Sequence, residues 1–552
     1  MREFTIAREM VAMRTRCILA LIASFTVAVA PGCSRILDDA LNPKYCAAHP
    51  TDTDCVEHCA AHPTDNECTP ADASVDAPAG CTSSSQCSAP TPACATDQMT
   101  CVQCTATDHA ACTGATPACA TDQMTCVQCT AADQRACTGT TPACATDRMT
   151  CVQCTATEHE ACTGTAPVCD ASDVCRACTV HPECSSEACL PSGACGDDTT
   201  VAYVDPAGSG TSCTKASPCV SVADALKTGR TFVKLHGTTD ELVSIDSRDV
   251  TFLADPGAQL TSTKNGVLLE IRGASHVAIY DLEITGASGM GAIGAGISLP
   301  TGFTGSMDLH GVKITSNAAA GISASGGTLT VTGSTLSSNQ GGGISVTGGM
   351  LTVTQSALSS NQGAAISATG TAVVISRSEI AANPGGGVSV SGAGATFDIT
   401  NSYITYNGLA SGPRATQLGG VALLPNDPRS RFEYNTVAFN GSDGSIFAGG
   451  VTCAGAMASA AGNLLYGNAE GATTDDTTQK RGACQFGNTL ALGSTPGDLG
   501  FNSPRASPFD FHLTAASPST VVDAGGICTG PDFDGDARPI GNACDLGADE
   551  VR

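Results

Sequence analysis

The sequence contains no tryptophan, and aromatic residues make up only 4% of its 552 residues. A core built on large aromatic rings is therefore excluded. Hydrophobic residues still account for 42% of the chain, which excludes global disorder. Burial must come from small β-branched and aliphatic side chains, and a chain of this length exceeds one ordinary domain.

Basic residues are scarce as well. Lys and Arg number 26 against 52 Asp and Glu, which gives a formal net charge of −26. Phosphates recruit Lys and Arg, so this balance argues against nucleic acid as a partner and indicates solubility outside the cell. No apolar stretch after the N-terminal region is long enough to span a bilayer, so we expect membrane contact through a lipid anchor only.

Cysteine, in contrast, is abundant. Of the 32 cysteines, 28 lie before residue 220. In a glycine-rich, aromatic-poor chain this density predicts an oxidising compartment, where disulfides replace the missing core.

Residues 1–32 are predicted to be a signal peptide. Arg14 and Arg16 precede an apolar run at 17–30, which has the length of a signal core rather than that of a membrane span. The residues Ala-Pro-Gly that precede Cys33 make this segment similar to a bacterial lipobox, whose cysteine becomes the lipidated N-terminus. Ser34 follows it, which in lipoproteins indicates sorting to the outer membrane. Cleavage after Ala30 by the general signal peptidase is the alternative, and would give a secreted protein.

Residues 33–80 are predicted to be a linker with a short duplication. The segment from Cys46 to Asp52 recurs from Cys59 to Asp65. Its His49 and His62 are metal-ligand candidates, but we favour solvated loop residues.

Residues 81–198 follow with a cysteine pattern that repeats every 25 residues. Removing Cys17 and Cys33 leaves 30 cysteines, an even number that suits disulfides. Pairs such as Cys101 and Cys104 also have zinc-ribbon spacing, but two further cysteines interrupt every interval, so disulfides are favoured. The connectivity stays open. We expect a rigid, protease-resistant spacer. The four series of repeated cysteines are Cys87, Cys112, Cys137 and Cys162; Cys94, Cys119, Cys144 and Cys169; Cys101, Cys126 and Cys151; and Cys104, Cys129 and Cys154.

Residues 199–552 have a different period. Four asparagines are spaced by 22 residues each, and three short alternating apolar segments, separated by Gly, Ser or Asn, keep step with them. Three strands and three turns per period predict one rung of a parallel β-helix, in which each rung buries its apolar face against its neighbours. The asparagines are interpreted as a structural ladder at a bend. They are Asn317, Asn339, Asn361 and Asn383.

The two ends of this region are less regular. Ser221 and Asp224 predict a short capped helix that covers the first rung. Asn407, Asn440 and Asn468 continue the ladder at wider spacings, so we expect the extra residues to form loops at 409–431 and 470–484. Three disulfides are predicted here: Cys213 with Cys219, Cys453 with Cys484, and Cys528 with Cys544.

This pattern resembles the right-handed parallel β-helix superfamily, which includes pectate lyases, polygalacturonases and many bacterial surface proteins. The segment 532–550, with its Asp-Phe-Asp-Gly-Asp-Ala-Arg-Pro opening, is similar to the closing motif of choice-of-anchor surface β-helices. The resemblance implies an all-β fold at a cell surface, and it does not imply a particular reaction.

Catalytic machinery of the superfamily is not recognisable. Its lyases need Asp-bound calcium with an Arg or Lys base, and its hydrolases need paired carboxylates. Residues 314–376 contain no Asp, Glu, Lys, Arg, His, Tyr or Cys. Charges gather instead on the late loops, which we take as the ligand-loop candidates; these residues are Arg414, Asp427, Arg429, Arg431, Asp475 and Asp476.

Asp532, Asp534 and Asp536 are a weak calcium candidate, because the distal Glu of an EF-hand loop is missing. A structural turn is favoured, and we expect no cofactor. The sequence therefore predicts a monomeric, non-enzymatic surface lipoprotein that binds polysaccharide or another cell-surface component. A polysaccharide lyase or glycoside hydrolase acting from the late loops is the alternative, and a purely structural component of the cell envelope is a third possibility.

Overall fold

The structure is a computed structural model that describes residues 80–551. The residues left out of this description are Thr96, Thr121, Gln123, Met290, Ala456, Ala458, Cys484, residues 495–497, Ser507 and Thr529. The predicted signal peptide, Cys33 and the His49/His62 duplication therefore lie outside the described residues. The chain forms two compact units, one ending at Ala136 and the other beginning at Cys137.

The cysteine repeats fold as short antiparallel hairpins in both units. In the first hairpin Cys94 lies opposite Cys101. The hairpins are β1 (Ala93–Ala95) with β2 (Thr100–Val102), β3 (Ala118–Ala120) with β4 (Thr125–Val127), β5 (Ala143–Ala145) with β6 (Thr150–Val152), and β7 (Val168–Cys169) with β8 (Cys175–Arg176).

Disulfides of two kinds hold these hairpins. One kind closes a loop within a repeat, as in Cys87–Cys101. The other joins a repeat to the next, as in Cys104–Cys119. The two cysteines of one C-x-x-C pair therefore belong to different disulfides, and neither thiolate of such a pair is free to bind zinc. Further disulfides of this region are Cys81–Cys94, Cys112–Cys126, Cys137–Cys151, Cys154–Cys169, Cys162–Cys175, Cys178–Cys189 and Cys184–Cys195.

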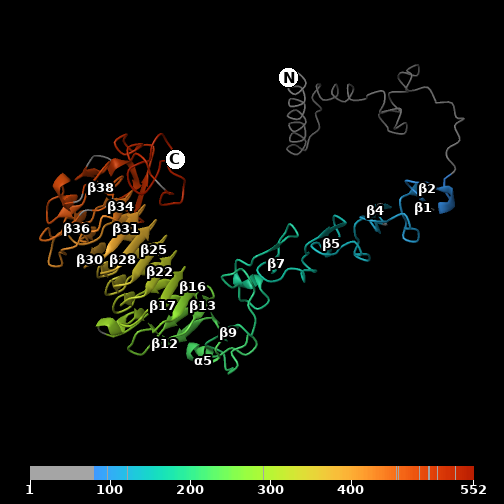
Figure 1. The fold of residues 1–552 in the computed structure, drawn as a ribbon, viewed down its shortest axis with the longest axis horizontal. Coiled ribbons are helices and arrows are strands. Elements are labelled where there is room, and N and C mark those ends of the chain that lie inside the picture. Colours follow the sequence, from blue (N-terminus) through green and yellow to red (C-terminus); the bar gives the residue numbers. More distant parts are fainter. Residues whose placement is uncertain are drawn as a thin grey trace, which may run out of the picture. The chain divides into compact units, whose positions relative to one another are not determined.

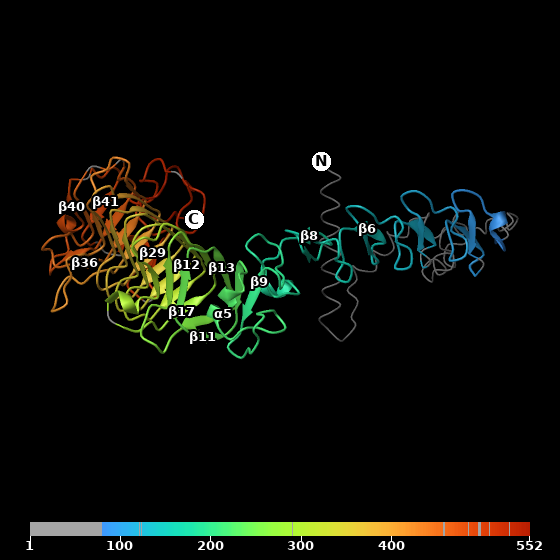
Figure 2. The ribbon, with the colours of Figure 1, turned by 60° about the horizontal axis from the view of Figure 1, so that its bottom comes forward.

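The second unit contains a parallel β-helix, shown along its length in Figure 1 and as successive turns in Figure 2. Three parallel sheets of 10, 11 and 10 strands run along it among the described residues. Each rung contributes one strand to each sheet, as the 22-residue period predicts. The predicted fold class, a right-handed parallel β-helix after a disulfide-rich region, is confirmed.

The first sheet consists of β9 (Val201–Val204), β10 (Phe232–Leu235), β13 (Val250–Ala254), β16 (His276–Tyr280), β19 (Ser306–His310), β22 (Thr328–Thr332), β25 (Met350–Thr354), β28 (Ala372–Ser376), β31 (Thr396–Thr400) and β34 (Arg431–Glu433).

The second sheet consists of β11 (Thr238–Asp240), β14 (Gln259–Thr261), β17 (Glu283–Thr285), β20 (Lys313–Thr315), β23 (Thr335–Ser337), β26 (Ala357–Ser359), β29 (Glu379–Ala381), β32 (Tyr403–Thr405), β35 (Thr436–Ala438), β38 (Leu464–Tyr466) and β41 (Leu490–Leu492).

The third sheet consists of β12 (Val243–Asp246), β15 (Leu269–Arg272), β18 (Ile297–Leu299), β21 (Ile322–Ala324), β24 (Ile344–Thr347), β27 (Ile366–Thr369), β30 (Val388–Ser391), β33 (Val421–Leu423), β37 (Val451–Cys453) and β40 (Lys480–Gly482).

A single apolar core runs through the rungs. Within each strand of the regular coils buried and partly exposed residues alternate, so Leu329 and Val331 of β22 are buried between three threonines. Equivalent residues stack on one another from rung to rung, as Leu329 does on Leu351. The first rung is covered by α5 (Val222–Lys227), whose N-cap Ser221 accepts a hydrogen bond from the backbone N–H of Asp224, as the sequence predicts.

The asparagines form a continuous buried ladder. Asn361 accepts from the amide Nδ2 of Asn339 at 2.8 Å and donates from its own Nδ2 to Asn383 Oδ1 at 2.9 Å. The chain of bonds continues through Asn407, Asn440 and Asn468 to Gln479. The left-handed backbone residue is not the asparagine itself but the residue before it, such as Ser338 with φ 58°.

The late insertions differ from the prediction of plain loops. The predicted loop 409–431 contains β33, which is fully buried, and the predicted loop 470–484 contains the 3-10 helix η4 (Asp476–Thr478) and β40. Every rung needs a third strand to pair with its neighbours, so each insertion has to include one. The added residues lie before and after these strands.

The parallel sheets end at β41. Residues 498–551 then begin with the 3-10 helix η5 (Asp498–Gly500) and form an antiparallel hairpin, β42 (Phe501–Ser503) with β43 (Asp510–Leu513). An irregular closing segment follows. The shorter elements elsewhere are η1 (Ser84–Gln86), η2 (His181–Glu183), η3 (Gly291–Gly294) and the strand pair β36 (Gly441–Ser442) with β39 (Ala469–Glu470).

Candidate functional site

The C-terminal segment folds back over the outer face of the second sheet. In β32 the central Ile404 packs into the β-helix core, whereas Tyr403 and Thr405 lie on the outer face and are nevertheless buried. Tyr406 donates a hydrogen bond to the carbonyl oxygen of Pro504, and Arg377 donates to that of Phe533. Residues more than 95 positions apart in the sequence are thereby brought together.

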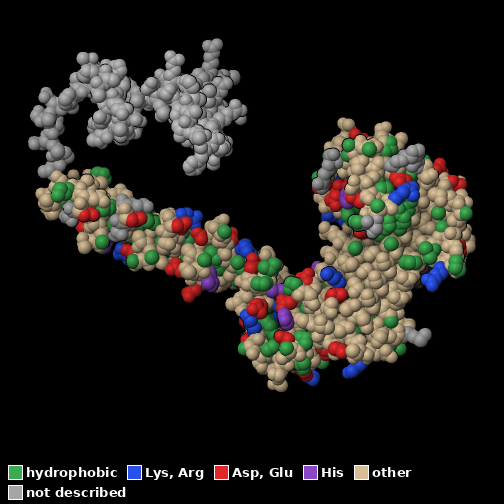
Figure 3. All heavy atoms as spheres, turned by 180° about the vertical axis from the view of Figure 1, so that it is seen from behind, with side chains coloured by type: hydrophobic (Ala, Val, Ile, Leu, Met, Phe, Trp, Pro, Cys, Tyr) green, Lys and Arg blue, Asp and Glu red, His purple; other side chains and the backbone are tan. Residues whose placement is uncertain are grey.

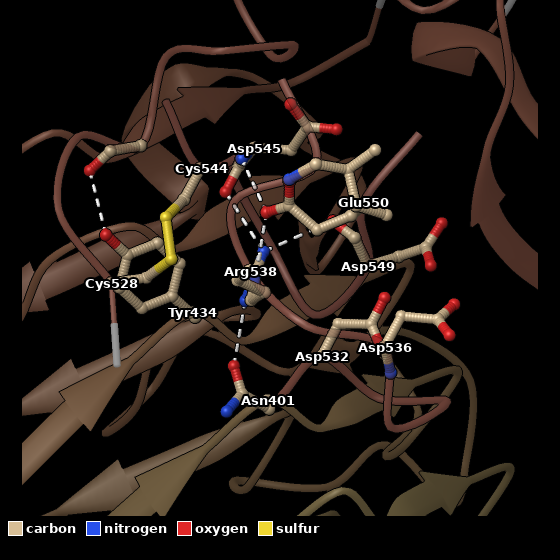
Figure 4. Close-up of polar contacts among 12 residues, drawn as sticks. Asn401, Tyr434, Cys528, Asp532, Asp536, Arg538, Cys544, Asp545, Asp549 and Glu550 are labelled. Carbon is tan, nitrogen blue, oxygen red and sulfur yellow. Dashed lines mark hydrogen bonds and ion pairs between the residues drawn. A yellow bond between two sulfur atoms is a disulfide. The ribbon is translucent and has the colours of Figure 1, made fainter. Parts of the chain in front are cut away.

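A fully buried ion pair anchors this segment. Arg538 and Glu550 have side chains that are 0% and 1% exposed, and they are joined at 2.6 Å. Figure 4 shows the Arg538 guanidinium also donating to Asn401 and lying against Tyr434, with the Cys528–Cys544 disulfide beside it. The predicted closing motif thus fixes the segment against the side of the β-helix rather than over its end.

Between the segment and the sheet lies a hollow of about 480 Å³. Many of the chain's few aromatic residues gather around it, and the ring centroids of Tyr403 and Phe533 are 4.4 Å apart. The residues that line the hollow are Glu379, Tyr403, Ser503, Pro508, Phe509, Asp510, Phe511, His512 and Phe533.

Two polar groups in its wall have no partner. Glu379 of β29 and Tyr403 of β32 are neighbours in adjacent rungs. The Tyr403 hydroxyl is buried without a hydrogen bond. The Glu379 carboxylate forms no hydrogen bond or ion pair with any residue that the structure describes. Burial raises the pKa of Glu379, against the opposing pull of His512.

His512 lies between two carboxylates. Its Nδ1 is 2.6 Å from Asp510 Oδ1 and its Nε2 is 3.1 Å from Asp534 Oδ2. Burial favours the neutral ring, but the hydrogen bond to Asp510 and the charges of Asp549 and Asp534 prevail and raise the pKa of His512. Burial likewise opposes ionisation of Asp510, yet its hydrogen bonds with His512 and Asn502 lower the pKa of this carboxyl.

Two further carboxylates stand behind the hollow. Asp549 is 4% exposed and accepts from the backbone N–H of Leu513, and burial raises its pKa to about 6. Asp532 is fully buried, and its Oδ2 has no hydrogen-bond partner. The same two residues, with Asp534 and Asp510, contribute negative charge that, after burial itself, raises the pKa of Tyr403 well above its usual value.

Two of the three carboxylates considered for calcium, Asp532 and Asp534, have separate surroundings. Asp532 accepts from the backbone N–H groups of Gly535 and Asp536, so it closes its own turn. Asp534 is directed to His512. The structure thus places Asp532 in a turn and joins Asp534 to the hollow.

Most of the charged side chains proposed from the late loops form ion pairs or hydrogen bonds with nearby residues. Arg429 pairs with Asp427, and Arg431 pairs with Asp398. Asp475 caps η4, and Asp476 accepts from the backbone N–H of Gly493. Arg414 is exposed. The structure therefore does not gather these residues into one site.

Two of the three predicted disulfides are found among the residues that the structure describes. Cys213–Cys219 and Cys528–Cys544 are both present. Cys453 is disulfide-bonded, and its predicted partner Cys484 lies outside the described residues.

The middle of the β-helix offers a different surface. Figure 3 shows a broad face there with few charged side chains, whereas acidic, histidine and hydrophobic side chains lie side by side near the C-terminal end. The many disulfides indicate an exported protein. No helix among residues 80–551, as far as they are described, is long and apolar enough to cross a membrane.

Sequence reasoning missed the hollow and a second polar ladder. Ser334 accepts from the backbone N–H of Val312, and Ser356 and Ser378 repeat this contact in the next rungs. The series passes through Ser402 to Asn435 and Asn463. The 22-residue spacing of the serines was a signal that could have revealed the ladder. No periodic signal marks the hollow, because its wall is assembled from distant segments.

The comparison with protein families supports the architecture. A model of the right-handed β-helix region matches residues 344–453, which contain the strands from β24 to β37. The crystal structure of the pectate lyase Pel9A is similar with a TM-score of 0.41 and 16% sequence identity, over 64% of this chain and 96% of that chain. No curated protein matches the chain in sequence.

Proposed function

We propose that the chain is an exported cell-surface protein that binds carbohydrate in the C-terminal hollow without altering it chemically. The β-helix serves as the scaffold, and the disulfide-linked repeats serve as a spacer between it and a lipid anchor at Cys33. The anchor belongs to the proposal on the strength of the sequence around Cys33.

One observation carries the binding role: the unpartnered Glu379 carboxylate and Tyr403 hydroxyl stand in adjacent rungs beside the aromatic rings of the hollow. Of the two groups, the Tyr403 hydroxyl is the buried one. A buried polar group without a partner costs about 1–3 kcal/mol, so a ligand that satisfies this hydroxyl gains that much. Sugars present apolar C–H faces together with hydroxyl groups, which suits rings flanked by hydrogen-bonding oxygens.

The size of the hollow agrees with this role. Its volume of about 480 Å³ falls within the range of small-molecule sites. Its aromatic rings lie on the rigid β-helix and on the segment clamped by Arg538, so little order has to be gained on binding.

A glycan array probed with the purified, oxidised protein tests the proposal. We expect binding to a limited set of glycans by the wild type, and loss of that binding in Glu379→Gln and Tyr403→Phe. Glu160→Gln, which removes an exposed carboxylate on the cysteine repeats, is the matched control and should bind as the wild type does. Binding to no glycan, or equal binding by all variants, would contradict the proposal.

Glycoside hydrolysis is the second candidate. In one hollow, burial raises the pKa of Glu379 while hydrogen bonds lower that of Asp510 against the effect of burial. A proton donor and an ionised carboxylate are what such hydrolysis requires. Incubation with the glycans bound on the array, followed by reducing-end analysis, decides between the two. New reducing ends that are absent with Glu379→Gln would establish hydrolysis in place of simple binding.

A further inference from the structure

We infer that the hollow selects a saccharide carrying a protonated amine, such as a glucosamine oligomer, over neutral and uronate saccharides. The inference rests on the proposed function, since it names the chemical class of the ligand of the same site.

The charge around the hollow is the first argument. Glu379 and Asp510 line it, and Asp534 contacts the ring of His512 that also lines it. Asp532 and Asp549 stand in the layer behind, close enough to act on the Tyr403 hydroxyl. The positive charges nearby are His512, when it is protonated, and Arg377, which donates to the carbonyl oxygen of Phe533.

Most of these carboxylates already accept hydrogen bonds from other residues, so a cation would bind at the one that does not. Asp510 accepts from Asn502 and from the backbone N–H of His512. Asp549 accepts from Leu513. Glu379 has no such partner among the described residues, although it is partly removed from water. A protonated amine would supply a positive charge and the missing hydrogen bonds together, and such charge-assisted bonds are about twice as strong as neutral ones.

The aromatic rings are the second argument. Tyr403 contacts Phe533 at 4.4 Å, and His512 and Phe511 lie at 5.7 and 6.2 Å from it. The faces of the Tyr and Phe rings carry negative electrostatic potential and attract ammonium groups within about 6 Å. The rings and the carboxylates therefore both favour a positively charged ligand. A uronate would instead bring its carboxylate beside those of Glu379 and Asp510, which would repel it.

A saccharide is favoured over a basic peptide because the unpartnered Tyr403 hydroxyl can donate a hydrogen bond as well as accept one. A lysine ammonium has no acceptor and cannot receive this bond, whereas a sugar hydroxyl can. A sugar ring carries the amine and neighbouring hydroxyls on one rigid frame. It can satisfy Glu379 and Tyr403 in adjacent rungs at once.

Calorimetry on the full-length oxidised protein at about pH 6 tests the inference, with hexamers of glucosamine, N-acetylglucosamine, galacturonate and lysine as probes. The glucosamine hexamer should bind at least about tenfold more tightly than its acetylated form, and the uronate should bind most weakly. Glu379→Gln should abolish the preference for the amine, whereas Glu160→Gln should retain it.

A second measurement needs no variant. Tetramethylammonium chloride should displace the glucosamine hexamer from the wild type, whereas sodium chloride at the same ionic strength should displace less. Equal affinity for the acetylated hexamer, or tighter binding of the uronate or of the lysine hexamer, would overturn the inference. Binding of neutral saccharides in that case leaves the proposed function standing, and absence of binding to every saccharide overturns both.

Discussion

Glu379 and Tyr403 are Cα partners in the register of β29 and β32, so a carboxylate and a hydroxyl stand one rung apart on the same outer face of the β-helix. The parallel ladder fixes this spacing at about 4.8 Å. The fold therefore sets the spacing of the backbone positions that carry the two groups, and the C-terminal segment covers Tyr403 and partly covers Glu379.

Stability should depend on pH through Asp549. Its folded pKa of about 6 lies above the ordinary aspartate value of 3.8, so its contribution to the free energy of unfolding is complete below about pH 4 and is lost as the pH rises through 6. Asp549→Asn should be more stable than the wild type by about 2 kcal/mol at about pH 7.5, and equally stable at about pH 4. Urea unfolding at the two pH values measures this difference. A variant that is less stable at both would contradict it.

Loss of the buried clamp should destabilise the C-terminal segment strongly. Arg538→Met leaves the Glu550 carboxylate buried without its cation, which costs about 3–5 kcal/mol. Arg429→Met removes an exposed ion pair with Asp427 and should cost less than about 1 kcal/mol. Thermal unfolding of both variants, followed by fluorescence of the tyrosines around the hollow, provides the comparison. Equal effects would show that the clamp contributes little.

A buried asparagine of the ladder should contribute more to the free energy of unfolding than an exposed residue beside it. Asn361→Ala removes bonds to Asn339 and Asn383 and leaves their buried groups unsatisfied, so we expect a loss of about 2–4 kcal/mol in the free energy of unfolding. The neighbouring Gln362 is exposed, and Gln362→Ala should change stability by less than about 0.5 kcal/mol. Hydrogen exchange at the rungs around β26 would locate the loss, and unchanged protection there would refute the role of the ladder.

The disulfide pattern predicts a definite peptide map. Digestion without reduction should recover Cys87 linked to Cys101 and Cys104 linked to Cys119. Replacing both Cys104 and Cys119 by serine opens a loop closed at a separation of 15 residues, which contributes on the order of 3 kcal/mol. Proteolysis of this variant should begin in the repeats and spare the β-helix. Recovery of a direct Cys101–Cys104 link would contradict the assignment.

Lipidation at Cys33 is a separate prediction from the sequence. Palmitate labelling of the expressed protein should be lost on Cys33→Ala, because only a cysteine at this position can receive the lipid. Cys17→Ala, within the predicted signal peptide, is the control and should leave the mature protein labelled. Labelling that persists in Cys33→Ala would exclude the anchor.

The regular coils could be predicted from the sequence because their information is local and periodic. Leu329 and Leu351 occupy the same place in successive repeats, as Asn339 and Asn361 do, and the structure stacks each pair accordingly. The sequence indicates a bend at the ladder asparagines, and the structure places the left-handed backbone one residue earlier, at Ser338 for example.

The hollow could not be predicted in this way. Its wall joins Glu379 and Tyr403 to Asp510, His512 and Phe533, and no repeat relates these residues to one another. The charges of the late loops were the more visible signal, yet Asp427 and Arg429 simply neutralise each other in a turn. Unpartnered groups can be identified only when the contacts of all their neighbours are known.

The spacing of the asparagine ladder widens from 22 residues to 24, 33 and 28, while the bonds between successive side-chain amides stay at 2.8–2.9 Å. The length of the connecting chain is thus independent of how the layers stack. Segments of new length and composition can be inserted at the outer corners without altering the interior. An architecture of this kind can acquire new recognition surfaces by insertion, and peptides grafted at these corners should leave the rest of the molecule intact.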